Sequence, residues 1–296
     1  MYVHCIAESI NIMGARTGKA MKERDPGPIQ LMANEEVANG ADFLDLNIGP
    51  ARKDGPDLMP WIVRQVEEVT DCPLSLDTTN ADALIAGIRA AAHPSRHIMN
   101  SISLQPERMK KLIPVAAEAG CYVVGLLWGV EGMPRDSNER AAMTVDLAMA
   151  MNEAGIPNER ILFDPIATPI TLGADQVLSG IQYLAMLQDI APGAKSTVGL
   201  SNVSNGVAAE KRHYLNRAYL AMLMKYGIWS AIVDAYDEEL LSLAHGERPE
   251  LLKVVHDIMD GNEPNPSDLT PKELEYYKTT RVLMGKTIFS EAWLEL

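Results

Sequence analysis

The sequence is poor in cysteine, in basic residues and in long apolar runs, and each shortage excludes a class of protein. Its three cysteines, Cys5, Cys72 and Cys121, are odd in number and widely separated. This indicates reduced, mostly buried thiols rather than a disulfide framework or a C-x-x-C metal site. The 26 lysines and arginines are outnumbered by 40 aspartates and glutamates, which gives a formal net charge of −14. Nucleic acid is therefore not the expected partner, because binding to a phosphate backbone needs a basic surface.

The sequence also lacks the apolar segments that membrane proteins need. The longest strongly apolar stretches, such as Cys121–Trp128, fall far short of the roughly 20 residues that span a bilayer. The amino-terminal segment shows no basic region followed by a long apolar run, so we expect no secretory signal. The sequence predicts a cytoplasmic protein with no membrane partner.

What is present is a chain of 296 residues, 47% hydrophobic and 22% charged, which supports a buried core. Short β-rich runs alternate with longer amphipathic stretches, as in repeated βα units. Eight such units predict one closed (β/α)₈ TIM barrel. A doubly wound open sheet is the alternative, but its G-x-G-x-x-G turn does not follow the first strand. The predicted strands are Val3–Ala7, Phe43–Asn47, Leu74–Asp77, His97–Asn100, Tyr122–Leu127, Ile161–Asp164, Thr197–Leu200 and Ala231–Asp234.

Helices are predicted between these strands, and two more follow the last unit. We expect a barrel over residues 1–246 and a helical extension over residues 247–296. The extension contains helix-like segments at Glu250–Met259 and Pro271–Met284, the second with Thr270 as its N-cap. It could finish the barrel, cover one end of it or help a second subunit to dock. The other predicted helices are Pro28–Asn39, Leu58–Val69, Ala81–Ala92, Pro106–Ala119, Arg140–Glu153, Ala174–Leu187, Arg217–Tyr226 and Glu238–Ala244.

Carboxylate and amide side chains recur where the predicted strands end. In a (β/α)₈ barrel the carboxyl ends of the strands form the active-site face. Any one of these residues could simply cap the following helix. Together they predict a ligand site at one rim, with only the fifth strand running instead into Trp128. The rim residues are Glu8, Asp45, Asn47, Asp77, Asn100, Asp164, Ser201, Asn202 and Asp234.

The chemistry of this rim limits its ligand. It has no histidine, cysteine or nearby lysine, so it suits neither zinc, nor a Ser-His-Asp nucleophile, nor Schiff-base catalysis. A carboxylate can accept two parallel hydrogen bonds from a planar pair of N–H donors, and an amide both donates and accepts. A neutral, planar, nitrogen-rich heterocycle fits this inventory. Magnesium held by several aspartates is the competing interpretation, although amides dilute the ligand set that it prefers.

Two other motifs are weaker. Residues 14–20 (GARTGKA) resemble a phosphate-binding loop, but one residue is missing between the glycines and Ala20 stands where a Ser or Thr is required, so we reject it. The six histidines show no metal-binding spacing, and we expect no metal site.

Five segments together resemble a known family: 44–50 (LDLNIGP), 76–80 (LDTTN), 99–101 (MNS), 163–165 (FDP) and 199–204 (GLSNVS). They are similar to the pterin-binding methyltransferases, above all to the methyltetrahydrofolate:corrinoid methyltransferases. That barrel is itself similar to dihydropteroate synthase and to the folate domain of cobalamin-dependent methionine synthase. The resemblance implies that Asp77, Asn100 and Asp164 bind the pterin ring and that Asn202 contacts its N5 atom. Ser201, Asn205 and Arg212 complete the implied pterin site, and Glu8, Asp45, Asn47 and Asp234 support the rim.

The resemblance also implies an activity. It is the transfer of a methyl group between N5 of tetrahydrofolate and the cobalt of a corrinoid on a separate protein, with Asn202 as the catalytic residue that stabilises protonated N5. The substrate is then tetrahydrofolate or 5-methyltetrahydrofolate, the partner is a corrinoid protein, and the enzyme is a homodimer. A dihydropteroate synthase is one alternative, but residues 201–204 (SNVS) and 234–237 (DAYD) occupy regions where that enzyme has basic anion-binding residues. A folate-binding protein without catalysis is the other.

Overall fold

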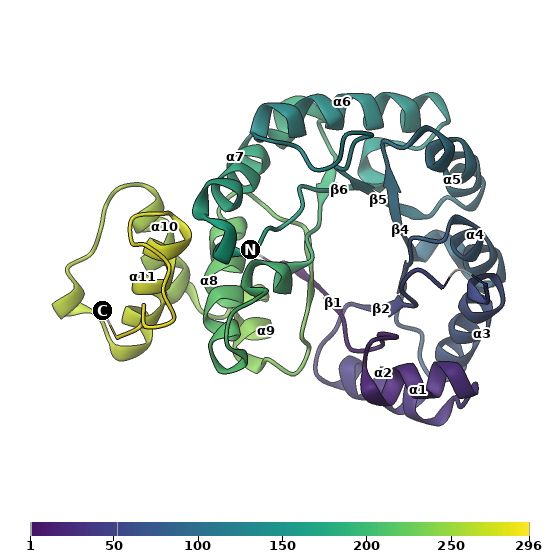
Figure 1. The fold of residues 1–296 in the computed structure, drawn as a ribbon, viewed down its shortest axis with the longest axis horizontal. Coiled ribbons are helices and arrows are strands. Elements are labelled where there is room, and N and C mark those ends of the chain that lie inside the picture. Colours follow the sequence, from purple (N-terminus) through teal and green to yellow (C-terminus); the bar gives the residue numbers. More distant parts are fainter. Residues whose placement is uncertain (1, 52, 296) are drawn as a thin grey trace.

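The chain forms a ring of parallel strands surrounded by helices (Figure 1). The computed structural model describes residues 2–51 and 53–295, so residues 1, 52 and 296 of the predicted domain ranges lie outside the described residues. The sheet order is β7-β6-β5-β4-β3-β2-β1-β8, which confirms the predicted (β/α)₈ barrel. The strands are β1 His4–Ala7, β2 Phe43–Asn47, β3 Leu74–Asp77, β4 Ile98–Ser103, β5 Tyr122–Leu126, β6 Ile161–Asp164, β7 Lys195–Ser196 and β8 Ser230–Val233.

The helices that follow the strands lie outside this ring (Figure 1). Most fall within a few residues of the predicted ranges. The helices are α1 Ala15–Glu23, α2 Gly27–Ala38, α3 Gly55–Glu67, α4 Ala81–Ala90, α5 Pro106–Ala119, α6 Ser137–Glu153, α7 Ala174–Ile190, α8 Arg212–Met224, α9 Glu238–Ala244, α10 Pro249–Met259 and α11 Pro271–Leu283.

The prediction for the seventh strand was wrong in position. The ladder of β7 ends at Ser196, whereas the sequence predicted a strand over Thr197–Leu200. After Ser196 the chain changes its hydrogen-bond partner from β6 to β8. The Thr197 N–H still donates to the Phe163 carbonyl of β6, whereas the Val198 carbonyl accepts from the Ile232 N–H of β8 at 2.8 Å. A single parallel bridge between Gly199 and Ile232 then closes the ring. After it the chain turns into a 3₁₀ helix, Leu200–Ser204.

The first helix, α1, was missed. The segment that holds it, Gly14–Ala20, was considered only as a phosphate loop. Its second glycine has a packing role, because a Cβ atom on Gly18 would lie 2.0 Å from the Ile12 carbonyl oxygen. That close approach requires a residue without a side chain.

Apolar side chains fill the amino-terminal end of the barrel interior. Ile6, Phe43, Ile98, Val124 and Leu162 come from five different strands and form one buried cluster. Each strand is also covered on its outer face by helices, which explains why the strands read as nearly continuous apolar runs. The polar rim therefore lies at the carboxyl ends of the strands, and the barrel interior beneath it is filled with apolar side chains.

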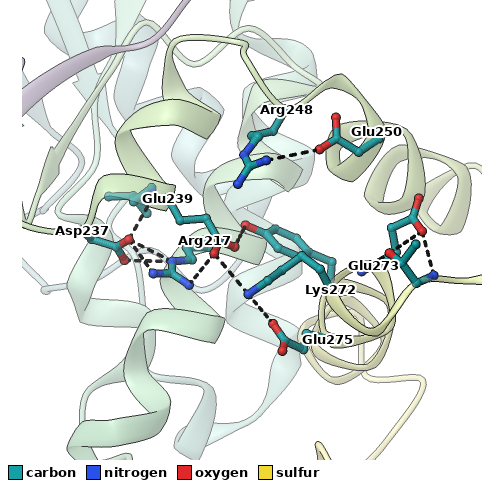
Figure 2. A network of polar contacts seen from close by, with 11 residues as sticks. Arg217, Asp237, Glu239, Arg248, Glu250, Lys272, Glu273 and Glu275 are labelled. Carbon is teal, nitrogen blue, oxygen red and sulfur yellow. Dashed lines mark hydrogen bonds and ion pairs between the residues drawn. The ribbon is translucent and has the colours of Figure 1, made fainter.

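The C-terminal helices α10 and α11 pack on α8 at the side of the barrel (Figure 1). The predicted N-cap at Thr270 is confirmed, since its side chain accepts from the Glu273 N–H, and the Glu273 side chain completes a capping box. Glu239 of α9 joins the barrel to the C-terminal helices. Its carboxylate pairs with Arg217 of α8 and Lys272 of α11, and it accepts a hydrogen bond from the Tyr276 hydroxyl, at 3.0 to 3.1 Å (Figure 2). The division between residues 246 and 247 stays a prediction.

The three cysteines are free, as the sequence predicted. No helix among residues 2–51 and 53–295 combines the length and the apolar composition required to cross a membrane.

Candidate active site

The predicted rim residues lie at or near the carboxyl ends of the strands. Glu8 follows β1, Asp77 ends β3, Asp164 ends β6 and Asp234 follows β8. Asn47 ends β2, two residues after Asp45, while Asn100 lies within β4 beside a break in the register with β5. Ser201 and Asn202 lie in the 3₁₀ helix after β7, Asn205 is the next residue after it, and Arg212 begins α8.

One part of the rim is a cavity of about 380 Å³. Asp77 and Asn100 line it, together with Arg108 of α5 and Trp128, a residue that is 41% exposed. Asp77 offers a carboxylate and Asn100 an amide, while the indole supplies a flat apolar surface. These groups suit a planar heterocycle with N–H donors at its edge.

A second cavity of about 270 Å³ lies between β1, β8 and α8. Glu8, Ser201, Arg212 and Asp234 line it, and the Ser201 hydroxyl donates to Glu8 Oε2 at 3.1 Å. The rim predicted as one site is thus two hollows on the same face. Asp164, Asn202 and Asn205 lie outside the lining of both.

A chain of hydrogen bonds leads from the second cavity to Asn202. Arg212 Nη2 donates to Asn205 Oδ1, and Asn205 Nδ2 donates to Asn202 Oδ1, each at 3.1 Å. Arg212 also holds the backbone of the 3₁₀ helix, since its Nη2 donates to the Ser201 carbonyl at 2.9 Å. The Oδ1 atom of the exposed Asn202 is therefore already engaged, which leaves its Nδ2 group to donate to a ligand.

Three carboxyl groups of the rim, those of Asp77, Asp164 and Glu8, have raised pKa values. Burial raises the pKa of Asp77 to about 6, although the Arg108 guanidinium opposes the shift. Burial also raises the pKa of Asp164 to about 7, and the Asp77 carboxylate contributes to this shift while the Ile166 N–H opposes it. The pKa of Glu8 is raised by burial against the hydrogen bond from Ser201. Groups that change charge near neutral pH, as Asp77 and Asp164 do, are typical of functional sites.

Two further acids lie beneath this rim. Asp45 is 2% exposed, and burial together with the Asp77 carboxylate raises its pKa well above the usual value. Glu36 of α2 is fully buried and accepts from the Ser9 N–H at 2.9 Å. Burial raises the pKa of Glu36 as well. No sequence pattern pointed to Glu36, because it lies in an otherwise ordinary helix.

Sequence reasoning missed two arginines that hold the site loops. Arg108 donates to the carbonyls of Ser101, Thr79 and Thr78 at 2.8, 2.7 and 3.1 Å, and so joins the loop after β3 to strand β4. Arg140 of α6 is fully buried.

The Arg140 side chain holds the loop that follows Asp164. Its Nε donates to the Pro165 carbonyl at 2.8 Å, and its other nitrogens donate to Ser179 and Gln176. A signal for such residues exists in the sequence, since both arginines lie in the first turn of a helix. A positive charge there opposes the helix dipole.

A comparison with protein families decides what kind of protein this site belongs to. Residues 8–234 match the family model described as pterin binding enzyme. The chain belongs to this family. The match runs from Glu8 after the first strand to Asp234 after the last, so it spans the whole rim of this pterin-binding enzyme.

Individual relatives of this pterin-binding enzyme include two kinds of methyltransferase. It is 24% identical over 238 residues to the methylcorrinoid:tetrahydrofolate methyltransferase of Eubacterium limosum, covering 80% of this chain and 86% of that protein. It is 27% identical over 245 residues to the methionine synthase of Mycobacterium tuberculosis, covering 77% of this chain but only 20% of that longer protein.

Solved structures show the same fold. The dihydropteroate synthase of Thermus thermophilus has a TM-score of 0.61 at 23% identity, covering 84% of this chain and 94% of that one. The dihydropteroate synthase of Xanthomonas albilineans has a TM-score of 0.61 at 19% identity, covering 86% and 94%. The pterin-binding enzyme is therefore a TIM barrel of the dihydropteroate synthase type.

Proposed function

We propose that this pterin-binding enzyme transfers a methyl group between N5 of tetrahydrofolate and a corrinoid carried by a separate protein. The observation that carries the proposal is the hydrogen-bond chain from Arg212 through Asn205 to Asn202. It presents an oriented amide at the rim of a barrel whose family binds pterins. The similarity to a methylcorrinoid:tetrahydrofolate methyltransferase supports the same reaction.

The chemical problem in this reaction is the leaving group. When the methyl carbon passes from N5 to the nucleophilic cobalt, the electron pair of the C–N bond stays on N5. The nitrogen is a good leaving group only if N5 carries a proton. Asn202 Nδ2 can donate to neutral N5, and Oδ1, which has a second lone pair beside the bond from Asn205, can accept from protonated N5. A contact that strengthens as the proton arrives lowers the barrier selectively.

The ring itself is proposed to bind in the larger cavity. Asp77 and Asn100 line this cavity and offer a carboxylate acceptor and an amide. Asp164 supplies a second carboxyl group, whose pKa is raised in part by the charge of Asp77. An ionised carboxylate accepts two parallel hydrogen bonds from an aminopyrimidinone. The raised pKa values mean that these acids are ionised only above about pH 6 to 7.

Exposed apolar side chains around the rim support a protein partner on this face. They belong to four different loops that follow strands, at Met13, Val130, Leu172 and Tyr236, with exposures of 87%, 78%, 80% and 47%. Apolar groups at the mouth of an active site are typical of a protein interaction surface. A corrinoid protein must reach N5 from this side. The homodimer stays a prediction, which sedimentation of the purified protein tests.

The decisive experiment replaces Asn202 by alanine. Methylation of free cob(I)alamin by 5-methyltetrahydrofolate is followed spectroscopically, and the reverse direction is measured with methylcobalamin and tetrahydrofolate. We expect kcat to fall by about 100-fold or more while folate affinity changes little. Asn158→Ala, whose amide lies in the loop before β6 at the other end of the barrel, is the matched control. Full turnover by Asn202→Ala would remove the catalytic role.

A dihydropteroate synthase is the second candidate, favoured only by the shared barrel of the solved structures. Its test is condensation of a pterin diphosphate with p-aminobenzoate. Product formation there, without any methyl transfer, would replace the proposal. Folate binding with neither activity would leave a binding protein.

A further inference from the structure

We propose that Cys5, Asp42 and His245 form a zinc-binding site at the amino-terminal end of the barrel, opposite the candidate active site. Cys5 is the second residue of β1, Asp42 directly precedes β2 and His245 directly follows α9. One ligand atom from each residue lies within 4.8 Å of the other two. Three segments that are far apart in the sequence thus bring a thiol, a carboxylate and an imidazole together.

The ligand types point to zinc. Thiolate sulfur, imidazole nitrogen and carboxylate oxygen are the three donors that zinc uses in proteins, while calcium and magnesium prefer oxygen alone. Zinc needs four ligands. Water can supply the fourth.

A second observation concerns His245. Its Nε2 atom is buried and has no hydrogen-bond partner, although buried polar atoms are nearly always paired. The Tyr2 ring stacks on the His245 ring at a centroid separation of 4.7 Å and an angle of 2°. Stacking therefore holds the imidazole by its face and leaves the nitrogen at its edge for another partner. A metal ion beside Cys5 and Asp42 supplies that partner.

The carboxylate of Asp42 is already oriented. The Cys5 N–H donates to Oδ2 and the Tyr2 hydroxyl to Oδ1, both at 2.8 Å. Each oxygen keeps a lone pair for a metal. Ligand carboxylates are commonly held by such outer hydrogen bonds, which fix their direction before the metal binds.

Zinc at this place would tie the first strand to the last βα unit. Cys5 and His245 are about 240 residues apart in sequence, so a link between them closes a loop that includes most of the barrel. The Val3 N–H already bonds the Ala244 carbonyl at 2.8 Å, and the metal would reinforce this junction. Binding forms a zinc–sulfur bond and releases the Cys5 thiol proton to solvent. The position at the amino-terminal face indicates a role in stability, not in catalysis.

The test uses the full chain without an affinity tag, because a polyhistidine tag itself binds zinc. Protein dialysed against EDTA is titrated with Zn²⁺ in competition with a chromophoric chelator, and separately with Co²⁺. We expect one ion per chain, a sulfur-to-cobalt charge-transfer band, and a thermal midpoint that rises with zinc. Cys5→Ala and His245→Ala should each weaken zinc binding by about 100-fold or more and abolish the cobalt band.

Cys121→Ala is the matched control, since Cys121 is an equally buried thiol in another part of the barrel. It should keep the metal, the cobalt band and the zinc-dependent stabilisation. Circular dichroism and folate binding report whether each variant is folded. Wild-type protein that takes up no zinc, or a cobalt band that persists in folded Cys5→Ala, overturns the proposal. Neither result bears on methyl transfer, whose residues lie at the opposite end of the strands.

Discussion

The side-chain amide of Asn47 donates a 2.6 Å hydrogen bond to Oδ2 of Asp77. The two residues are direct neighbours in the register of β2 and β3, and the Gly49 N–H fixes the amide by donating to Asn47 Oδ1 at 2.9 Å. One oxygen of the Asp77 carboxylate is thus held from the side. The hydrogen bond favours the ionised form in a place where burial favours the neutral one.

This pair predicts a pH dependence of pterin binding. A protonated carboxyl group cannot accept two hydrogen bonds from the ring, so affinity should fall as the pH decreases through about 7 and 6, the pKa values of Asp164 and Asp77. Asn47→Ala removes the donor that favours the ionised form of Asp77. The pKa of Asp77, and with it the lower of the two transitions in affinity, should move to higher pH, and binding at pH 7 should be about 10-fold weaker. Calorimetric titration with a reduced folate between pH 5 and 8 measures both. A flat profile in the wild type contradicts the assignment.

Asp164→Asn should stabilise the protein without ligand. The folded-state pKa of Asp164, about 7, lies above that of an unfolded aspartate, so folded protein binds the extra proton and loses stability as the pH rises from about 4 to 7. Asparagine removes this penalty, keeps the acceptor for the Ile166 N–H, and should add about 2 kcal/mol at pH 8. The gain should vanish near pH 4, and pterin binding should weaken. Thermal unfolding at both pH values checks this, and an unchanged midpoint at pH 8 would contradict it.

Arg140→Met should destabilise the protein and disorder the loop after β6. The methionine fills the space, but the Pro165 carbonyl, Ser179 and Gln176 lose their donor. We expect a loss of about 3 kcal/mol in the free energy of unfolding, because buried acceptors are left unpaired. Urea denaturation measures it. Arg135→Met, on an exposed side chain nearby, should change little, and an equal loss there would mean that Arg140 has no special role.

Asn205 acts as a positioning residue in the proposed reaction. Asn205→Ala breaks the chain between Arg212 and Asn202, and the Asn202 amide is then free to rotate. We expect kcat to fall by about 10-fold with little change in KM, because only the orientation of the amide at N5 is lost. Asn205→Gln, which keeps the amide, should restore part of the rate. A structural role alone would lower stability and leave kcat of the folded fraction intact.

Glu239→Ala should loosen the C-terminal helices. It removes the partner of Lys272 and Tyr276 on α11, while Arg217 keeps its bidentate contact with Asp237. We expect a loss of about 1 to 2 kcal/mol, since the group is mostly buried. Glu250→Ala, which breaks a separate exposed ion pair with Arg248, should cost less than about 0.5 kcal/mol. Equal losses in denaturant unfolding would show that Glu239 does not join the two parts.

The repeat of βα units could be predicted because burial on both faces leaves an apolar signal in most of the strands, although not in the two-residue β7. The failures have local causes. The helix α1 was missed because its glycines suggested a loop, whereas Gly18 serves a close approach to the Ile12 carbonyl. The seventh strand was misplaced because Thr197 and Val198 are extended and buried like strand residues but bond to β6 and β8 in turn.

The location of the rim residues at the ends of the strands was predictable from the sequence, but the contacts between them were not. The rule that chemistry gathers at the carboxyl ends of barrel strands placed Asp77, Asp164 and Asp234 correctly at one rim. No pattern in the sequence predicted that the rim divides into two hollows, or that Arg108 joins the loop after β3 to strand β4 through three carbonyl groups. Such contacts depend on which loops meet, and that is settled only by the closed ring.

The short β7 has a consequence for how this enzyme can change. Asn47, Asp77, Asn100 and Asp164 stand on strand backbone that neighbouring strands hold in place. Beyond β7 the chain has no continuous ladder, and it is held by one hydrogen bond each to β6 and β8, one bridge and the guanidinium of Arg212. Substitutions and insertions in this segment should therefore cost little folding stability. They can change the position of Asn202 relative to the reacting nitrogen while the rest of the barrel keeps its structure.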